Sequence, residues 1–91
     1  MPPKARELFW ARKAQEDVDS LWRYFENVAS PDVADRLHSN IVAAASRLCD
    51  RPYIGRPRDE FRHGLRSLRV DAYALYYLVR EDAIIIVRVL H

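Results

Sequence analysis

Residues 73–90 read YALYYLVREDAIIIVRVL, and this stretch decides the fold class. Aromatic and β-branched side chains fill residues 73–80 and residues 83–90, and a short charged connection separates the two runs. This composition is typical of strands, and a short connection between strands favours an antiparallel pair. Residues 65–70 form a similar run just before them. The pattern therefore predicts a three-stranded antiparallel meander in the last third of the chain.

Both faces of the last two predicted strands are largely apolar. Successive side chains of a strand point to opposite faces, which puts Leu75 and Tyr77 on one face and Tyr76 on the other. In residues 83–90 only Arg88 interrupts the apolar run. We therefore expect an interior strand, or a strand whose second face meets a partner.

Before residue 50 the apolar side chains recur at the spacing of a helix. One stripe consists of Ala14, Val18, Leu21, Trp22, Phe25 and Val28, and the second consists of Ala34, Leu37, Ile41, Ala44, Ala45 and Leu48. Between the stripes, Ser30-Pro31-Asp32 supplies an N-cap hydroxyl, a proline suited to the first helical position and an acid near the positive helix end. The short break predicts an antiparallel helical hairpin.

The segments that flank this hairpin complete the expected fold. Residues 4–10 show an apolar alternation and could form a first strand. Pro52 ends the second helix because the residue before a proline avoids the α region, and residues 51–64 are expected to form an irregular basic loop. The expected class is α+β, with an N-terminal strand and the antiparallel two-helix hairpin packed on a C-terminal three-stranded antiparallel meander.

The composition indicates one globular domain over residues 1–91. Apolar residues make up 49% of the chain, which argues against disorder. Fifteen Lys and Arg against thirteen Asp and Glu leave a net charge of +2, so we expect no sequence-specific DNA binding by this chain. Cys49 is the only cysteine, which excludes an internal disulfide and disfavours a thiolate metal site. Neither a metal nor a cofactor is expected.

Neither a signal peptide nor a membrane-spanning segment is expected. Lys4, Arg6 and Glu7 interrupt the first ten residues with charge. Elsewhere no run approaches the roughly 18–20 apolar residues of a membrane span. A cytoplasmic location follows as the default.

The order of these elements and five short motifs resemble the ParE/RelE toxins. The motifs are Ala14-x-x-Asp17, Ser30-Pro31, Gly55-Arg56-Pro57-x-x-Glu60, Gly64-Leu65-Arg66 and the final Arg88-Val89-Leu90-His91. Their shared order covers nearly the whole chain. The chain is therefore identified as a member of this superfamily, and more closely as a ParE-like toxin of a type II toxin-antitoxin module.

The resemblance implies a protein that acts on a large partner. ParE-like toxins bind DNA gyrase and block it without chemistry of their own, so the implied function is gyrase inhibition by a protein that is not an enzyme. A ParD-like antitoxin encoded alongside neutralises such toxins, which implies a hetero-oligomer with the antitoxin. RelE-like toxins instead cleave messenger RNA on the ribosome. A decayed toxin that only binds antitoxin is a third alternative, because family members commonly continue past the final motif with a basic tail.

The candidate residues bear on these alternatives. Metal-free RNA cleavage needs a base, an acid and cations for the phosphate. RelE-like enzymes usually supply lysines and arginines with a tyrosine or histidine near the last strand, whereas this chain has no lysine after Lys13 and no tyrosine after Tyr77. We therefore assign no catalytic residue. The residues expected to contact gyrase or antitoxin are Arg56, Arg58, Arg62, Arg66, Arg69, Arg80, Arg88 and His91.

A structural interpretation of the same residues stays open. The arginines of the loop could pair with Asp59 and Glu60 as solvated charge, and His91 could make only a structural hydrogen bond. The adjacent acids Glu16 and Asp17 do not converge as a catalytic pair would, and we expect them to be solvated charges or caps. In the complex we expect an amphipathic antitoxin helix in a toxin groove, with its acids meeting the arginines.

Overall fold

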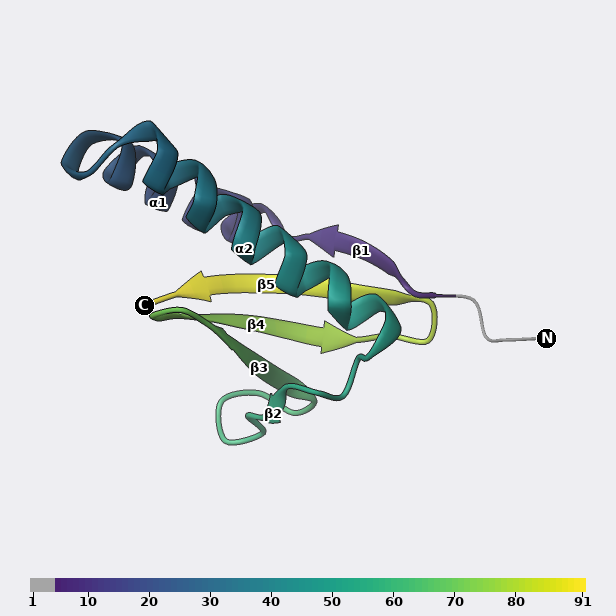
Figure 1. Ribbon diagram of the computed structural model, residues 1–91. Helices are drawn as coiled ribbons and strands as arrows, with labels where there is room; N and C mark the ends of the chain where they lie inside the picture. Colours follow the sequence, from purple (N-terminus) through teal and green to yellow (C-terminus); the bar gives the residue numbers. More distant parts are fainter. Residues whose placement is uncertain (1–4) are drawn as a thin grey trace.

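The computed structural model describes residues 5–91 and shows a helical hairpin on one face of a five-stranded sheet (Figure 1). The sheet order is β1-β5-β4-β3-β2. The strands are β1 (Glu7–Trp10), β2 (Arg56–Pro57), β3 (Leu65–Val70), β4 (Tyr73–Val79) and β5 (Ala83–Leu90), and the helices are α1 (Arg12–Val28) and α2 (Pro31–Asp50). The predicted α+β class, N-terminal strand, hairpin and antiparallel meander are confirmed. Lys4, the first residue of the predicted N-terminal strand, lies outside the described residues.

Strand β5 is an interior strand, as one of the two sequence-based alternatives predicted. It pairs antiparallel with β4 along one side. On its other side β1 pairs with it in parallel, from Glu7 opposite Ala83 to Trp10 opposite Ile86. The parallel direction of β1 was not predicted, because this pairing joins the two ends of the chain and leaves no local pattern.

The hairpin forms where the local signals predicted it. The Ser30 hydroxyl accepts a hydrogen bond from the Val33 amide at 3.2 Å, and Pro31 occupies the first turn. Helix α2 ends at Asp50, one residue before the Arg51-Pro52 step. The two helices contact each other, and their small residues Ala14 and Ala34 are buried.

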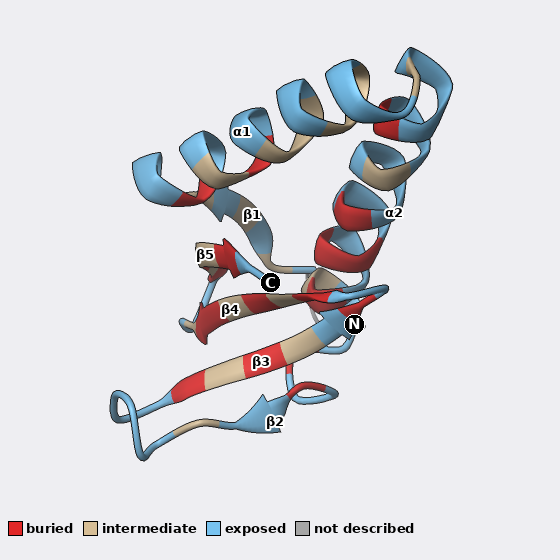
Figure 2. Cartoon of the chain, turned by 90° about the vertical axis from the view of Figure 1, so that its left-hand side faces the viewer, coloured by how far each residue is buried: buried red, intermediate tan, exposed pale blue. Residues whose placement is uncertain are grey.

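The core lies between the hairpin and the face of the sheet that the hairpin covers, which we call the inner face (Figure 2). Six large side chains at its centre are less than 2% exposed: Ile41, Leu48, Leu75, Tyr77, Ile84 and Ile86. Burying such side chains contributes roughly 1.5–3 kcal/mol each relative to leaving them in water. The opposite face of the sheet, the outer face, is covered by no helix within residues 5–91.

The prediction that residues 51–64 are wholly irregular is wrong. Strand β2 lies in this loop and pairs antiparallel with β3, with Arg56 opposite Ser67. A tertiary contact aligns it, because the Tyr77 hydroxyl donates a hydrogen bond to the Pro52 carbonyl at 2.8 Å and accepts one from the Gly55 amide at 2.9 Å. Sequence patterns within the loop do not report a partner more than twenty residues away.

No helix within residues 5–91 is long and apolar enough to cross a membrane.

Candidate partner-binding face

Side chains of three neighbouring strands line up on the outer face of the sheet. Cross-strand pairing aligns Leu65 of β3, Leu78 of β4 and Ile85 of β5 in one row. The next row aligns Ser67, Tyr76 and Arg88 in the same order of strands. The alternating residues Leu75, Tyr77 and Ile86 lie in the core, so these side chains point to the opposite face of the sheet.

A hollow of about 480 Å³ opens on this face, and we call it the outer groove. Its lining residues are Phe61, Arg62, Leu65, Tyr76, Val87, Arg88 and Leu90. The two arginines are the only charged residues in this lining. Phe61 is 67% exposed and Leu90 is 38% exposed, so apolar surface is available to a partner.

Five of the eight predicted contact residues share the outer face. Arg62 and Arg88 line the outer groove. Arg58 donates a hydrogen bond from Nε to the Ser67 hydroxyl at 2.9 Å. Arg56 lies opposite Ser67, and Arg69 lies opposite Ala74, as the strand register requires. The outer groove is therefore a largely apolar hollow lined by two arginines, and three more arginines lie on the same face of the sheet.

Three predicted residues lie elsewhere. Arg66 is on the inner side, where its Nε donates to the Gly55 carbonyl at 3.1 Å and its guanidinium lies 5.3 Å from the centre of the Tyr53 ring. Arg80 lies beyond β4, in the turn before β5. His91 contacts the inner-face residue Tyr73 edge to face, with ring centres 5.5 Å apart. These three side chains do not line the outer groove.

The loop arginines are not simply solvated charge. Arg58 is anchored on Ser67 and also lies 3.7 Å from a Glu60 carboxylate oxygen. Arg66 joins the loop to the sheet through the carbonyls of Gly55 and Tyr53. The structural alternative of pairing with Asp59 or Glu60 therefore describes Arg58 in part, and it does not describe Arg66, whose partners are backbone carbonyls.

The expectation that Asp17 is a solvated charge or a helix cap is wrong. Its carboxylate accepts bonds from Arg88 Nε at 2.8 Å, from Arg88 Nη2 at 3.0 Å and from the Val89 amide at 3.0 Å. Burial alone would raise the pKa of Asp17, but the bonds from Arg88 and Val89 outweigh it and lower that pKa below its ordinary value. The same contact raises the pKa of Arg88. Arg88 is thus held as a cation on the wall of the outer groove.

The apolar lining of the groove was missed from the sequence. Phe61 was read as part of a basic loop, and Val87 and Leu90 were read only as strand residues. The available signal was the apolar second face of β4 and β5, which indicated a covering partner without indicating where the hollow lies.

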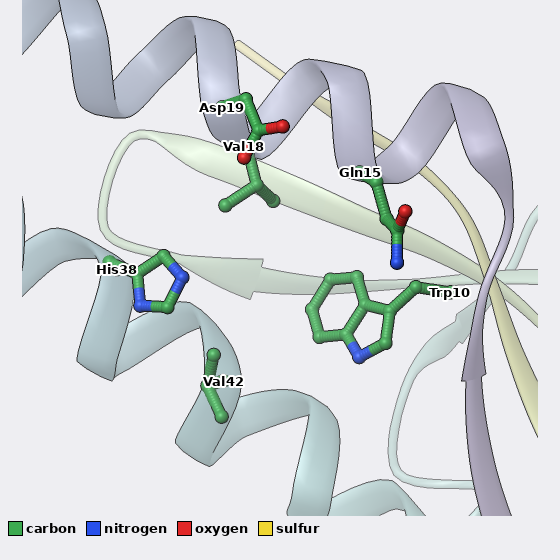
Figure 3. A pocket seen from close by; sticks show the side chains of 6 residues that line it. All are labelled: Trp10, Gln15, Val18, Asp19, His38 and Val42. Carbon is green, nitrogen blue, oxygen red and sulfur yellow. The ribbon is translucent and has the colours of Figure 1, made fainter.

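A second hollow, of about 380 Å³, opens between the helices (Figure 3). Its lining residues are Trp10, Gln15, Val18, Asp19, His38 and Val42. None of the predicted contact residues lies there. Within residues 5–91, no three His, Cys, Asp or Glu side chains are grouped closely enough to hold a metal ion.

A family model described as the ParE toxin of the type II toxin-antitoxin system, parDE, matches residues 8–91. The chain belongs to the ParE toxin family. The resemblance inferred from the five motifs is thereby confirmed, and the matched residues include the whole of α1, α2 and the meander of this ParE-family chain.

Individual relatives agree with the family. The chain is 34% identical over 79 residues to Toxin ParE1 of Mycobacterium tuberculosis, which covers 86% of this chain and 81% of the relative. It is 32% identical over 80 residues to Toxin RelE3 of Caulobacter vibrioides, which covers 87% and 86%. A solved structure of the chromosomal ParDE TA system from P. aeruginosa superposes with a TM-score of 0.82 over 96% of both chains. At 24% identity, this last likeness shows a shared fold alone.

Proposed function

We propose that this ParE-family toxin inhibits DNA gyrase by binding it in the cytoplasm, and that it does so without catalysis. The observation that carries the proposal is the chemistry of the outer groove. A groove lined by apolar side chains and two arginines suits a protein surface that offers apolar anchors and acidic groups. Gyrase inhibition is typical of the ParE family to which the chain belongs.

The outer groove is poorly equipped for RNA cleavage. Its lining includes no histidine and no carboxylate. Apart from the arginines, the Tyr76 hydroxyl is the one group in this lining that could donate or accept a proton. His91 lies outside this lining and contacts the inner-face residue Tyr73 instead. The nuclease alternative keeps support from the likeness to Toxin RelE3 and from the arginines of the outer face.

A ParD-like antitoxin is the proposed neutralising partner, in a hetero-oligomer with this chain. The outer groove fits an amphipathic antitoxin segment whose apolar side chains meet Phe61, Val87 and Leu90 while its acids meet the two arginines of the lining. Such a segment orders as it binds, which makes it easy to release when the antitoxin is degraded. No sequence-specific DNA contact by this chain is part of the proposal.

The deciding experiment is plasmid supercoiling by purified gyrase with added toxin, beside an in-vitro translation reaction with the same toxin. Loss of supercoiling with normal translation is the expected result. Cleaved message with normal supercoiling would assign the chain to the nuclease branch, and antitoxin binding without either effect would indicate a decayed toxin.

Matched variants connect the activity to the outer groove. Phe61→Ala removes an exposed ring from the groove wall, and Phe9→Ala removes a ring that is 50% exposed on β1. Both are expected to leave the fold intact, because surface substitutions usually change stability by less than about 0.5 kcal/mol. Inhibition should weaken for Phe61→Ala and not for Phe9→Ala. Equal inhibition by both variants would count against this groove as the contact.

A further inference from the structure

The Asp17 side chain lies beside the end of β5, on the strand edge that β1 does not cover. The pairing of β1 with β5 ends at Trp10, opposite Ile86. One residue later the chain turns into α1, which begins at Arg12. Within residues 5–91 no strand pairs with the rest of β5 on this side, and its Val89 amide donates to Asp17 at 3.0 Å. A carboxylate on α1 thus satisfies a backbone donor that would otherwise be left on an open sheet edge.

An irregularity in the sheet turns Arg88 to the outer face. Tyr76 pairs with Arg88, whereas Tyr77 pairs with Ile86, so Val87 has no partner on β4. This extra residue shifts the alternation of β5, which keeps Ile86 and Val89 in the core while Arg88 shares the outer face with Tyr76. From there the guanidinium reaches around the open edge to Asp17.

The bond to Asp17 uses only one edge of the guanidinium. A guanidinium has five N–H donors in a plane, and Asp17 accepts from Nε and Nη2. Arg88 Nη1 donates no hydrogen bond to any residue among 5–91, and the side chain remains 40% exposed on the groove wall. The Nη1 edge is therefore free to bind a second anion in the planar, two-point manner typical of arginine.

We infer that Asp17 preorients Arg88 to bind one carboxylate of the acidic amphipathic antitoxin segment in the outer groove. This inference rests on the proposed function and names the recognition chemistry at its site. Arg88 is the contacting residue and Asp17 is a positioning residue. Because the guanidinium is already fixed in the free toxin, less side-chain freedom is lost when the partner binds.

The surroundings of Arg88 favour a protein carboxylate over an RNA phosphate. The neighbours of its side chain in the groove are Val87, Leu90 and Tyr76. A ligand that binds here must present apolar groups immediately beside its anion, as an amphipathic helix does. A nucleic-acid backbone would instead require several cations along its path, whereas only Arg62 and Arg88 line the outer groove.

The test measures the dissociation constant of the full-length toxin for its full-length ParD-like antitoxin by isothermal titration calorimetry. Arg88→Lys keeps the positive charge and can still pair with Asp17, but it lacks the second planar edge. Asp17→Asn keeps the shape of the side chain and loses the charge that orients Arg88. Each variant is expected to bind antitoxin roughly ten- to a hundredfold more weakly, the range of one charge-assisted hydrogen-bonding contact. Arg47→Lys, an exposed arginine of α2, is the matched control and should bind as the wild type does.

The double variant Asp17→Asn/Arg88→Lys separates positioning from general destabilisation. If Asp17 acts through Arg88, the double variant binds no more weakly than Arg88→Lys alone. A purely structural role of Asp17 predicts that the two losses multiply, and that result would overturn the inference. All measurements are made at a temperature at which circular dichroism shows every variant to be folded.

The remaining outcomes are also decisive. An Arg88→Lys affinity within twofold of the wild type overturns the inference and leaves the proposed function standing. Wild-type toxin that does not bind antitoxin contradicts the proposed function itself. A fluorescein-labelled single-stranded RNA that loses affinity for Arg88→Lys, while antitoxin does not, would identify Arg88 as a phosphate contact instead.

Discussion

Replacing Tyr77 with phenylalanine removes one oxygen atom that holds the loop after α2 against the sheet. That hydroxyl donates to the Pro52 carbonyl at 2.8 Å and accepts from the Gly55 amide at 2.9 Å, and the side chain is fully buried. Burial raises the pKa of Tyr77, so the hydroxyl keeps its proton and remains a donor at neutral pH. The substitution leaves a backbone carbonyl and a backbone amide without their partner.

The expected cost follows from these two bonds. Each hydrogen bond contributes about 1 kcal/mol net, and a buried polar group left unpaired costs about 1–3 kcal/mol. We expect Tyr77→Phe to lower the free energy of unfolding by about 2–3 kcal/mol. For a domain of this size, that corresponds to a fall in Tm of about 10–20 °C.

Urea denaturation followed by tryptophan fluorescence measures this change, with Tyr24→Phe as the control. The Tyr24 side chain is 58% exposed, and we expect its variant to stay within about 0.5 kcal/mol of the wild type. Amide hydrogen exchange should also quicken at Gly55 in Tyr77→Phe. A Tyr77→Phe stability within 0.5 kcal/mol of the wild type would refute the claim that this hydroxyl anchors the loop.

Three further predictions concern stability. Gly55→Ala brings a Cβ into collision with the Tyr77 hydroxyl and should lower the free energy of unfolding by about 2 kcal/mol or more. Urea titration should show a smaller added loss in a Tyr77→Phe background, because that oxygen is absent there. Because the pKa of Asp17 is lowered in the folded protein, its ion pair stabilises the fold above pH ~4 and is lost as the pH falls further. The wild type should therefore lose more stability than Asp17→Asn between about pH 5 and 2. Parallel profiles of stability against pH for the two proteins would contradict this. Ser30→Ala removes the N-cap of α2 and should cost about 1 kcal/mol in thermal denaturation, whereas Ser39→Ala, on an exposed part of the same helix, should not.

Much of the fold was predictable because its signals are local. Helix α2 has its cap, its proline and its apolar stripe within one segment, and its observed ends agree with them. The meander strands are recognisable from β-branched and aromatic runs separated by two-residue or three-residue connections. Family membership was predictable for a related reason, since the five motifs stand in a fixed order along the chain.

The candidate site was predictable only in part. Arginines clustered in the second half of the sequence, but their roles depend on which side of the sheet each one faces. Arg62 and Arg88 line the outer groove, whereas Arg66 pins the loop from the inner side. The extra residue in β5 changes the alternation at its end, so counting by twos from the start of the strand assigns Arg88 to the wrong face.

The sequence by itself determined the class of fold, the helical hairpin, the meander and the family. The tertiary structure decided that β1 runs parallel to β5, that a short β2 extends the sheet, and that Asp17 orients Arg88 from 71 residues away. The physical reason is the range of the interactions. Periodicity and caps act between residues a few positions apart, whereas the open edge of β5 acquires its partner only when the ends of the chain come together.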